Sequence, residues 1–331
     1  MKNLTVIWRQ VIKMERKWII GLCLVALVVI LALVFMNSCG YSHDASDEKL
    51  IGDSPYSGDI AGSLSYSIDL KSSMPENPQK ILVYKTIPPI VNTEAALALA
   101  KKFNVTGNMV GDQGVQSTDL RYSIWISKKS GLMEYTDAKR PNEGLDAPDM
   151  LPSEEDAIMI ATRYLKENDL LPDGAEKGKA SYEYATSLDK DGVEILRYGS
   201  VTVGFARKLN GLEVKGAGVS VTLGGNGDII GYSSDWRMYT PNNEYPIKSS
   251  ETAFAELKKN GIKTGIENPS QVTINNVYLA YASKAPAFEE EYLEPVWVFK
   301  GEKTTKDAKI KPVTEYIPAL TDDAAKSLSS S

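Results

Sequence analysis

The sequence predicts an α+β protein in which an N-terminal transmembrane or lipoprotein signal helix precedes tandem units, each a helix laid on an antiparallel sheet. Three observations predict this fold class. Residues 18–36 are apolar and uncharged. Three helical patterns are each followed by strand patterns. The pairs Asn210-Gly211 and Asn226-Gly227 separate alternating segments, as in two-residue β-hairpins.

The uncharged segment is long enough to cross a membrane as a helix. At a rise of about 1.5 Å per residue, residues 18–36 nearly span the roughly 30 Å hydrocarbon core. Basic residues precede the segment, and Asp44, Asp47 and Glu48 follow it. The positive-inside rule then places the N-terminus in the cytoplasm. We therefore expect the protein at the cytoplasmic membrane, with its body on the extracytoplasmic face.

Cys39 offers a second way to tether the same body. The residues around it, Met36-Asn37-Ser38-Cys39-Gly40, resemble the lipobox of bacterial lipoproteins. The sequence leaves open whether Cys39 is cleaved and lipidated or the helix is retained. The other cysteine, Cys23, lies within the apolar segment, so the body is expected to have neither a disulfide nor a cysteine zinc site.

Composition and charge exclude several classes of partner. An apolar fraction of 43% and a charged fraction of 24% are typical of a folded protein. The net charge is −6, although basic residues are concentrated in residues 1–17. The remaining body is therefore acidic, and it repels nucleic acid and anionic lipid headgroups.

The helical patterns cover residues 93–103, 153–168 and 250–259. Each begins with a cap residue, an acid in the first turn and then small apolar residues. True repeats and convergent capping both explain this likeness. The strands expected between and after these helices are residues 81–84, 120–127, 132–135, 180–185, 193–207, 212–223, 228–236, 272–282, 295–300 and 313–317.

The predicted organisation follows from these patterns and from loops rich in Pro, Gly, Ser and Asp. In order, we expect a basic cytoplasmic region (1–17), the transmembrane or signal helix (18–36), a stalk linker (37–78), a first α+β unit (79–150), a second α+β unit with a central β-meander (151–245), a third α+β unit (246–320) and a frayed polar tail (321–331).

Three segments resemble PepSY-type and cystatin-like domains. Residues 153–161 fit the S-x-E-x-A-I-x-x-A helix pattern of PepSY repeats. Residues 210–219 resemble the central hairpin of PepSY domains and of related protease propeptides, and residues 293–299 resemble their P-V-W strand. The layout is similar to that of the YycH and YycI regulators of a membrane sensor kinase. The resemblance covers residues 93–319 and implies a non-catalytic, regulatory function.

The sequence shows no constellation typical of an enzyme, a metal site or a cofactor site. The single histidine, His43, lies in the expected stalk, where no fold holds it for zinc binding or for a catalytic relay. The acidic run 289–291 is interpreted as a solvated loop. We therefore expect no catalytic residue, no metal and no cofactor.

The sequence predicts a protein that binds a protein or peptide partner and modulates a peptidase or a membrane signalling protein such as a sensor kinase. A small-ligand-binding or structural surface lipoprotein is the alternative, and a carboxylate-based hydrolase is a third. An exposed strand could pair with an extended peptide. The candidate partner-binding residues are Lys215, Val219, Val221, Leu223, Trp236 and Trp297.

Overall fold

The computed structural model describes five stretches of the chain: residues 66–138, 150–188, 190, 193–263 and 269–330. They belong to one compact unit, residues 42–331. The predicted membrane or signal helix (18–36), Cys39 and His43 lie outside the described residues. Within these stretches, no helix has the length and apolar character needed to cross a membrane.

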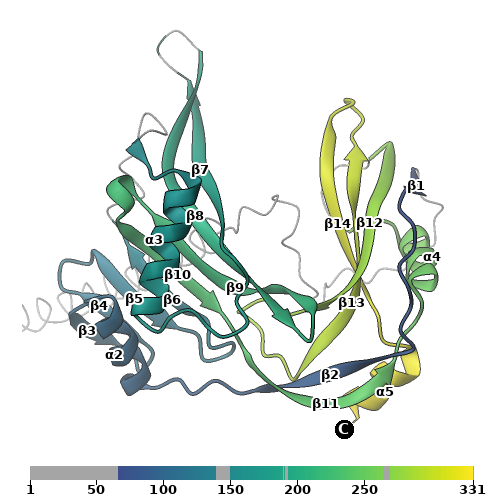
Figure 1. The fold of residues 1–331 in the computed structure, drawn as a ribbon, viewed down its shortest axis with the longest axis horizontal. Helices are drawn as coiled ribbons and strands as arrows, with labels where there is room; N and C mark the ends of the chain where they lie inside the picture. The colour runs from purple at the N-terminus through teal and green to yellow at the C-terminus, as the bar shows by residue number, and fades with distance from the viewer. Residues whose placement is uncertain (1–65, 139–149, 189, 191–192, 264–268, 331) are drawn as a thin grey trace, which may run out of the picture. The chain divides into compact units, whose positions relative to one another are not determined.

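The strands of the described residues form one mixed sheet of 14 strands (Figure 1). They are β1 (Ser67–Leu70), β2 (Lys80–Ile87), β3 (Gly107–Val110), β4 (Gly114–Ser117), β5 (Tyr122–Ile126), β6 (Met133–Asp137), β7 (Lys179–Leu188), β8 (Glu194–Leu209), β9 (Leu212–Leu223), β10 (Ile229–Asp235), β11 (Met238–Pro246), β12 (Gln271–Ala282), β13 (Tyr292–Thr304) and β14 (Ile310–Pro318).

The sheet has two parts. Its main path runs β11-β2-β13-β12-β9-β10-β6-β5-β4-β3, with β8, β14 and β1 paired to β9, β13 and β12, and β7 paired to β8. We call strands β3–β10 the amino half-sheet and the other strands the carboxy half-sheet. The halves meet where β9 and β12 pair in parallel, Val214 opposite Tyr281 and Lys215 opposite Ala282. The chain enters the amino half between β2 and β3, and it returns to the carboxy half through Trp236 and Arg237, between β10 and β11.

Four helices are described: α2 (Thr93–Lys102), α3 (Glu154–Glu167), α4 (Ser250–Asn260) and α5 (Asp322–Ser329). The first three confirm the predicted helices. Each of these helices starts at a residue whose side chain caps it. In α3, for example, the Ser153 hydroxyl accepts a hydrogen bond from the Asp156 amide at 3.2 Å. Helix α2 packs on β4 and β5, α3 packs on β7, β8 and β9, and α4 packs on β14 (Figure 1).

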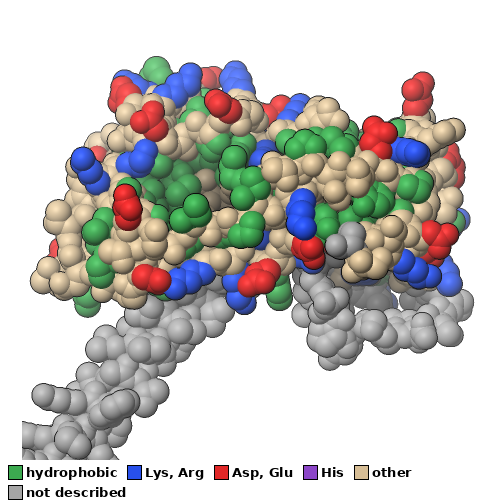
Figure 2. Space-filling model, turned by 90° about the horizontal axis from the view of Figure 1, so that it is seen from below, with side chains coloured by type: hydrophobic (Ala, Val, Ile, Leu, Met, Phe, Trp, Pro, Cys, Tyr) green, Lys and Arg blue, Asp and Glu red, His purple; other side chains and the backbone are tan. Residues whose placement is uncertain are grey.

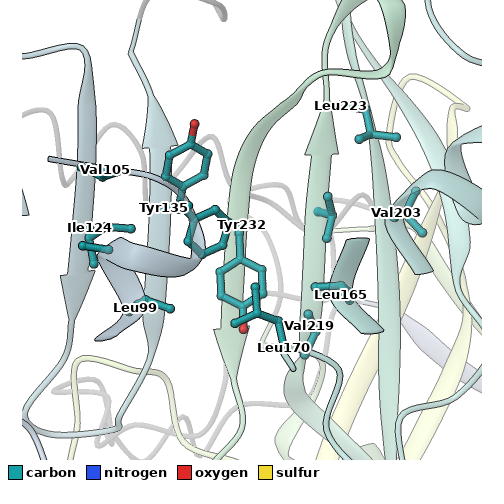
Figure 3. Close-up of a cluster of buried hydrophobic side chains, with 14 of the residues drawn as sticks. Leu99, Val105, Ile124, Tyr135, Leu165, Leu170, Val203, Val219, Leu223 and Tyr232 are labelled. Atoms are coloured by element: carbon teal, nitrogen blue, oxygen red, sulfur yellow. The ribbon is translucent and has the colours of Figure 1, made fainter. Parts of the chain in front are cut away.

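The largest core lies between α2, α3 and one face of the amino half-sheet. Figure 3 shows its side chains converging from the helices and strands, among them Leu99, Ile124 and Leu165. Phe103 at the end of α2 stacks on Tyr135 of β6, with ring centroids 4.4 Å apart. Because the apolar face of the sheet and the apolar faces of both helices are buried together, this core fixes the amino half-sheet.

The two Asn-Gly pairs form different turns. Asn210 and Gly211 have φ angles of 50° and 80° and connect Leu209 to its partner Leu212, which confirms the two-residue hairpin between β8 and β9. Asn226 and Gly227 also have positive φ angles, but they belong to a short 3-10 turn, Gly225–Gly227. The Gly224 amide donates to the Asp228 carbonyl at 2.9 Å, so the prediction of a two-residue hairpin turn is wrong at this position.

The predicted fold class is wrong, because the described residues do not form tandem helix-on-antiparallel-sheet units. The N-terminal transmembrane or signal helix that was predicted to precede them lies outside the described residues. A tandem unit would pair its strands among themselves. Instead, β2 pairs with β11 and β13, and β6 pairs with β10, so distant segments share one large sheet. Parallel pairing of β1 and β9 with β12 also departs from a purely antiparallel layout. Local periodicity predicts strands, but these distant partners decided the architecture.

Both ends of the described chain contribute to the core, in contrast to the expected loose stalk and frayed tail. β1 falls within the expected stalk, yet it pairs with β12, and Ile68 is buried. Helix α5 falls within the expected polar tail, and Ala324 and Leu328 are buried in a cluster with Val83 and Tyr281. Ala324 and Leu328 are the buried residues of α5, and two apolar positions are too few for the helix to be recognised in the sequence.

Candidate partner-binding site

Four exposed apolar side chains lie near the passage from β10 to β11. We call Ile87, Ile90, Met238 and Phe288 the junction patch. Their exposed fractions are 43%, 85%, 59% and 52%. Ile87 and Met238 lie opposite each other in the β2–β11 pair, so their side chains share a face. Phe288 belongs to the neighbouring loop, where its carbonyl accepts a hydrogen bond from Arg237, the residue before Met238.

Polar groups flank this patch. Lys85 forms an exposed ion pair with Glu291 at 3.7 Å. Figure 2 shows a face on which hydrophobic side chains gather in patches between scattered charged ones. An apolar centre with a polar rim is the usual anatomy of a protein interface.

β11 lies at one end of the sheet path. In the described part of the chain it pairs only with β2, so one side of its backbone has no partner strand. Pro241 and Pro246 lack the amide hydrogen that a new strand would need. The part of this edge beside the junction patch is Met238–Thr240, where alternate residues turn their backbone groups away from β2. An extended peptide can add to such an edge.

Beneath the junction patch, Arg237 ties the β10–β11 link to the loop between β12 and β13. It is buried, and its Nη2 donates to the carbonyl oxygens of Lys284, Ala285 and Phe288 at 3.0, 3.3 and 3.1 Å. Three backbone acceptors on one guanidinium hold this loop, residues 283–291, against the link.

Arg207 of β8 holds the link from the other side. Its Nη1 donates to the Arg237 carbonyl at 2.6 Å. Its guanidinium lies over the rings of Trp236 and Tyr239, 4.6 and 4.7 Å from their centroids. Burial lowers the pKa of Arg207, since the protein interior disfavours the charged form. The two aromatic faces offset part of that cost through cation–π attraction.

Arg207, Asp235, Arg237 and Glu290 form a buried, charged cluster. Of its two acids, Glu290 has the more hydrogen bonds. Its carboxylate accepts hydrogen bonds from the Tyr239 hydroxyl at 2.8 Å, from the Thr86 hydroxyl at 3.3 Å and from the Lys284 amide. Burial raises the pKa of Tyr239, and the charge of Glu290 adds to that shift. The Tyr239 hydroxyl therefore remains a donor at physiological pH.

Asp235 is buried without comparable support. Neither carboxylate oxygen has a hydrogen-bond partner among the described residues, and the nearest guanidinium nitrogen, Arg237 Nε, is 4.0 Å away. Burial raises the pKa of Asp235 to about 7. The charge of Glu290 acts in the same direction, while those of Arg237 and Arg207 oppose it. Asp235 is therefore the group of this cluster that titrates near neutral pH.

Most of the candidate residues predicted from sequence lie in the core. Val219, Val221, Leu223 and Trp297 are fully buried, which leaves their side chains no surface for a partner. The alternation of apolar and polar residues correctly indicated a half-buried strand β9. It did not show that helices of the same chain, and not a partner, cover the apolar face.

The remaining two candidates lie nearer the surface. Lys215 is partly buried, pairs with Glu213 at 2.7 Å and lies over the Tyr278 ring. Trp236 is partly buried beside Arg207, next to the junction patch. The structure brings Trp236, but not Trp297, to the candidate site.

Sequence reasoning missed Arg207, Asp235, Arg237 and Glu290. The acidic run 289–291 was interpreted as solvated, but Glu290 is buried while its two neighbours are exposed. One signal existed: Asp235-Trp236-Arg237 places two charges at the end of an apolar strand pattern. Their partners come from segments far along the chain, so the cluster itself had no local signature.

The described residues contain no group of three or more His, Cys, Asp and Glu side chains that could hold a metal ion. Asp235 and Glu290 both lie 4.0 Å from Arg237 Nε, which makes them the acidic pair of this cluster. Both are buried, and Glu290 already accepts three hydrogen bonds. The pair therefore gives no support to the carboxylate hydrolase alternative, which needs both groups to face a substrate.

Comparisons with known proteins add little. No protein-family model and no curated protein matches the chain. Among solved structures, the chain is similar to the crystal structure of an uncharacterized protein from Eubacterium rectale, with 13% identity and a TM-score of 0.44. That match covers 76% of this chain and 86% of the other. This TM-score is too low to carry an argument, and the resemblance to PepSY-type and cystatin-like domains stays a prediction.

Proposed function

We propose that this protein is a non-catalytic, extracytoplasmic protein, tethered at the membrane, that binds an extended segment of a partner protein at the junction patch. The partner is a peptidase or a membrane signalling protein, which this binding modulates. The tether rests on the sequence of residues 18–39 alone.

One observation carries the proposal: the junction patch adjoins the unpaired edge of β11. Exposed apolar side chains are common singly, but a pair opposite each other on neighbouring strands is less usual. An added strand would pair with the backbone groups of Met238–Thr240 that point away from β2, and its side chains would lie against the patch. The buried Arg237 holds the Phe288 loop against the β10–β11 link.

The proposal is tested by capture from the membranes of the cells that make the protein. The full chain is used as bait, unmodified, with Met238→Asp and with Met159→Asp. Met159 is exposed to a similar degree, 57%, but it lies on α3, away from the patch. A partner retained by the wild type and by Met159→Asp, and lost with Met238→Asp, supports the proposal. Equal retention by both variants overturns it.

A further inference from the structure

The loop that carries Phe288 is held on one side of a buried, charged cluster. Arg237 reaches three carbonyls of this loop, and Glu290 accepts the Lys284 amide within it. The Phe288 amide donates to the Ala285 carbonyl at 2.9 Å. The position of one patch residue therefore depends on how firmly the cluster stays closed.

The cations of the cluster are already committed to other acceptors. Nη2 of Arg237 serves the loop carbonyls, and Nη1 of Arg207 serves the Arg237 carbonyl. Arg237 Nε has no hydrogen-bond partner among the described residues and lies 4.0 Å from both Asp235 and Glu290. The two acids thus share one distant donor, and Glu290 has three closer ones.

The groups that face Asp235 come from several neighbouring elements. On β6, the acid Glu134 lies opposite Ser233, on the same face of β10 as Asp235, and burial raises the pKa of Glu134. Arg237 lies on the link that follows Asp235, Arg207 on β8 and Glu290 on the loop. Tyr239 of β11 contacts Glu290. On β9, the residue opposite Asp235 is Gly218, which carries no charge. A charged Asp235 is therefore left in the interior with two committed cations and the repelling charge of Glu290.

We propose that Asp235 makes the loop 283–291 open more often as the pH rises, because its charged carboxylate gains hydration only when the loop leaves Arg237. An ionised carboxylate without hydrogen bonds is costly in the interior, whereas the neutral acid is not. Opening moves Phe288 away from Arg237 and so changes the junction patch. As a statement about regulation, this rests on the proposed function; the opening itself does not.

The proposed direction, more opening of the loop at higher pH, agrees with the titration of Asp235. Its pKa of about 7 lies above that of a solvated aspartate, so the closed loop holds one more proton than the open loop between these values. Opening then releases that proton, and rising pH favours the open loop. Once Asp235 is ionised in both states, above its pKa in the closed protein, no further dependence is expected.

The test is amide hydrogen exchange of the full chain, measured without any partner from about pH 5 to about pH 8 and converted to protection factors. The wild type should lose protection at Lys284 and Phe288 as the pH rises, by at most about tenfold per pH unit, the limit for one proton. Amides of Val219 and Leu165, in the core, should stay protected. A flat profile in the wild type overturns the proposal by itself.

Two variants identify the group responsible. Asp235→Asn keeps the shape of the side chain but cannot ionise, so the protection of Lys284 and Phe288 should become independent of pH. Asp173→Asn changes an exposed acid and should keep the wild-type profile. If Asp235→Asn retains the wild-type slope, the proposal is wrong.

The hydrogen-exchange experiment and the capture experiment test different claims, so each can fail without the other. Because exchange is measured without a partner, loss of the pH profile overturns the opening of the loop but leaves the junction patch untested by that result. Retention of the partner by Met238→Asp overturns the proposed function, whatever the exchange profile. If both the loop opening and the binding at the junction patch are correct, the wild type should capture less partner at about pH 8 than at about pH 6. Asp235→Asn should capture the same amount at both.

Discussion

Arg237 binds Phe288 through the backbone: its Nη2 donates to the Phe288 carbonyl oxygen at 3.1 Å. The contact joins residues that are far apart in sequence, one in the link between the half-sheets and one in the β12–β13 loop. The Arg237 guanidinium thus ties the backbone of Phe288 to the residue that precedes Met238. The junction patch is consequently a property of the tertiary structure and not of either segment alone.

Replacing Arg237 should destabilise the whole unit. Arg237→Ala leaves three loop carbonyls without this donor and removes a cation beside Asp235 and Glu290. Breaking a buried charged pair by removing one partner typically costs about 3–5 kcal/mol. Urea denaturation should show a loss of that size. Arg163→Ala, at an exposed position of α3, should change stability by less than about 0.5 kcal/mol.

Trp297 should behave as a core residue. Its ring is fully buried, and its indole Nε1 donates to the Lys248 carbonyl at 2.9 Å. Trp297→Ala should lower the free energy of unfolding by about 3–5 kcal/mol through the cavity that it leaves. Trp297→Phe should cost less, since most of the ring volume remains. An unchanged urea midpoint for Trp297→Ala would contradict its assignment to the core.

Gly211 and Gly199 form a matched pair for testing the β8–β9 turn. A methyl group added at either position meets no atom within 4 Å, but only Gly211 has a positive φ angle, 80°. Gly211→Ala should therefore destabilise the protein by about 1–2 kcal/mol through backbone strain alone. Gly199→Ala should not, because its backbone already suits an L-residue. Equal urea midpoints would show that the turn relaxes.

The stability of the protein should respond to pH through Asp235. Its pKa is about 7 in the folded state, above the 3.8 of a solvated aspartate. The contribution of the neutral acid to stability is thus complete below about pH 3.8 and is lost as the pH rises through about 7. Relative to the wild type, Asp235→Asn should gain stability from pH 5 to pH 8, measured by urea unfolding. A constant difference would contradict this sign.

Local patterns in the sequence predicted most of the elements. The three main helices begin at or next to their predicted caps, and β9 covers the predicted residues 212–223. The strand β11 escaped prediction because its two prolines and paired asparagines are typical of loops. It forms because β2, more than 140 residues earlier in the chain, supplies its partner backbone.

The candidate site was less predictable than the fold elements. Sequence periodicity placed apolar residues such as Val219 in a strand, but the helices that cover that strand come from other segments. Likewise, nothing near Glu290 in the sequence announces that Tyr239, Thr86 and Arg237 surround it. Only Trp236 was among the candidates from sequence and also lies beside the site.

Site-specific photo-crosslinking in the cells that make the protein tests the central claim most directly. A photoreactive phenylalanine derivative replaces Met238, Phe288 or Met159, one at a time, in the full chain. We predict that the probes at Met238 and Phe288 crosslink the same partner, and that the equally exposed Met159 probe on α3 does not. Crosslinking of that partner from Met159 alone, or no product from either patch position, would contradict the proposed binding site.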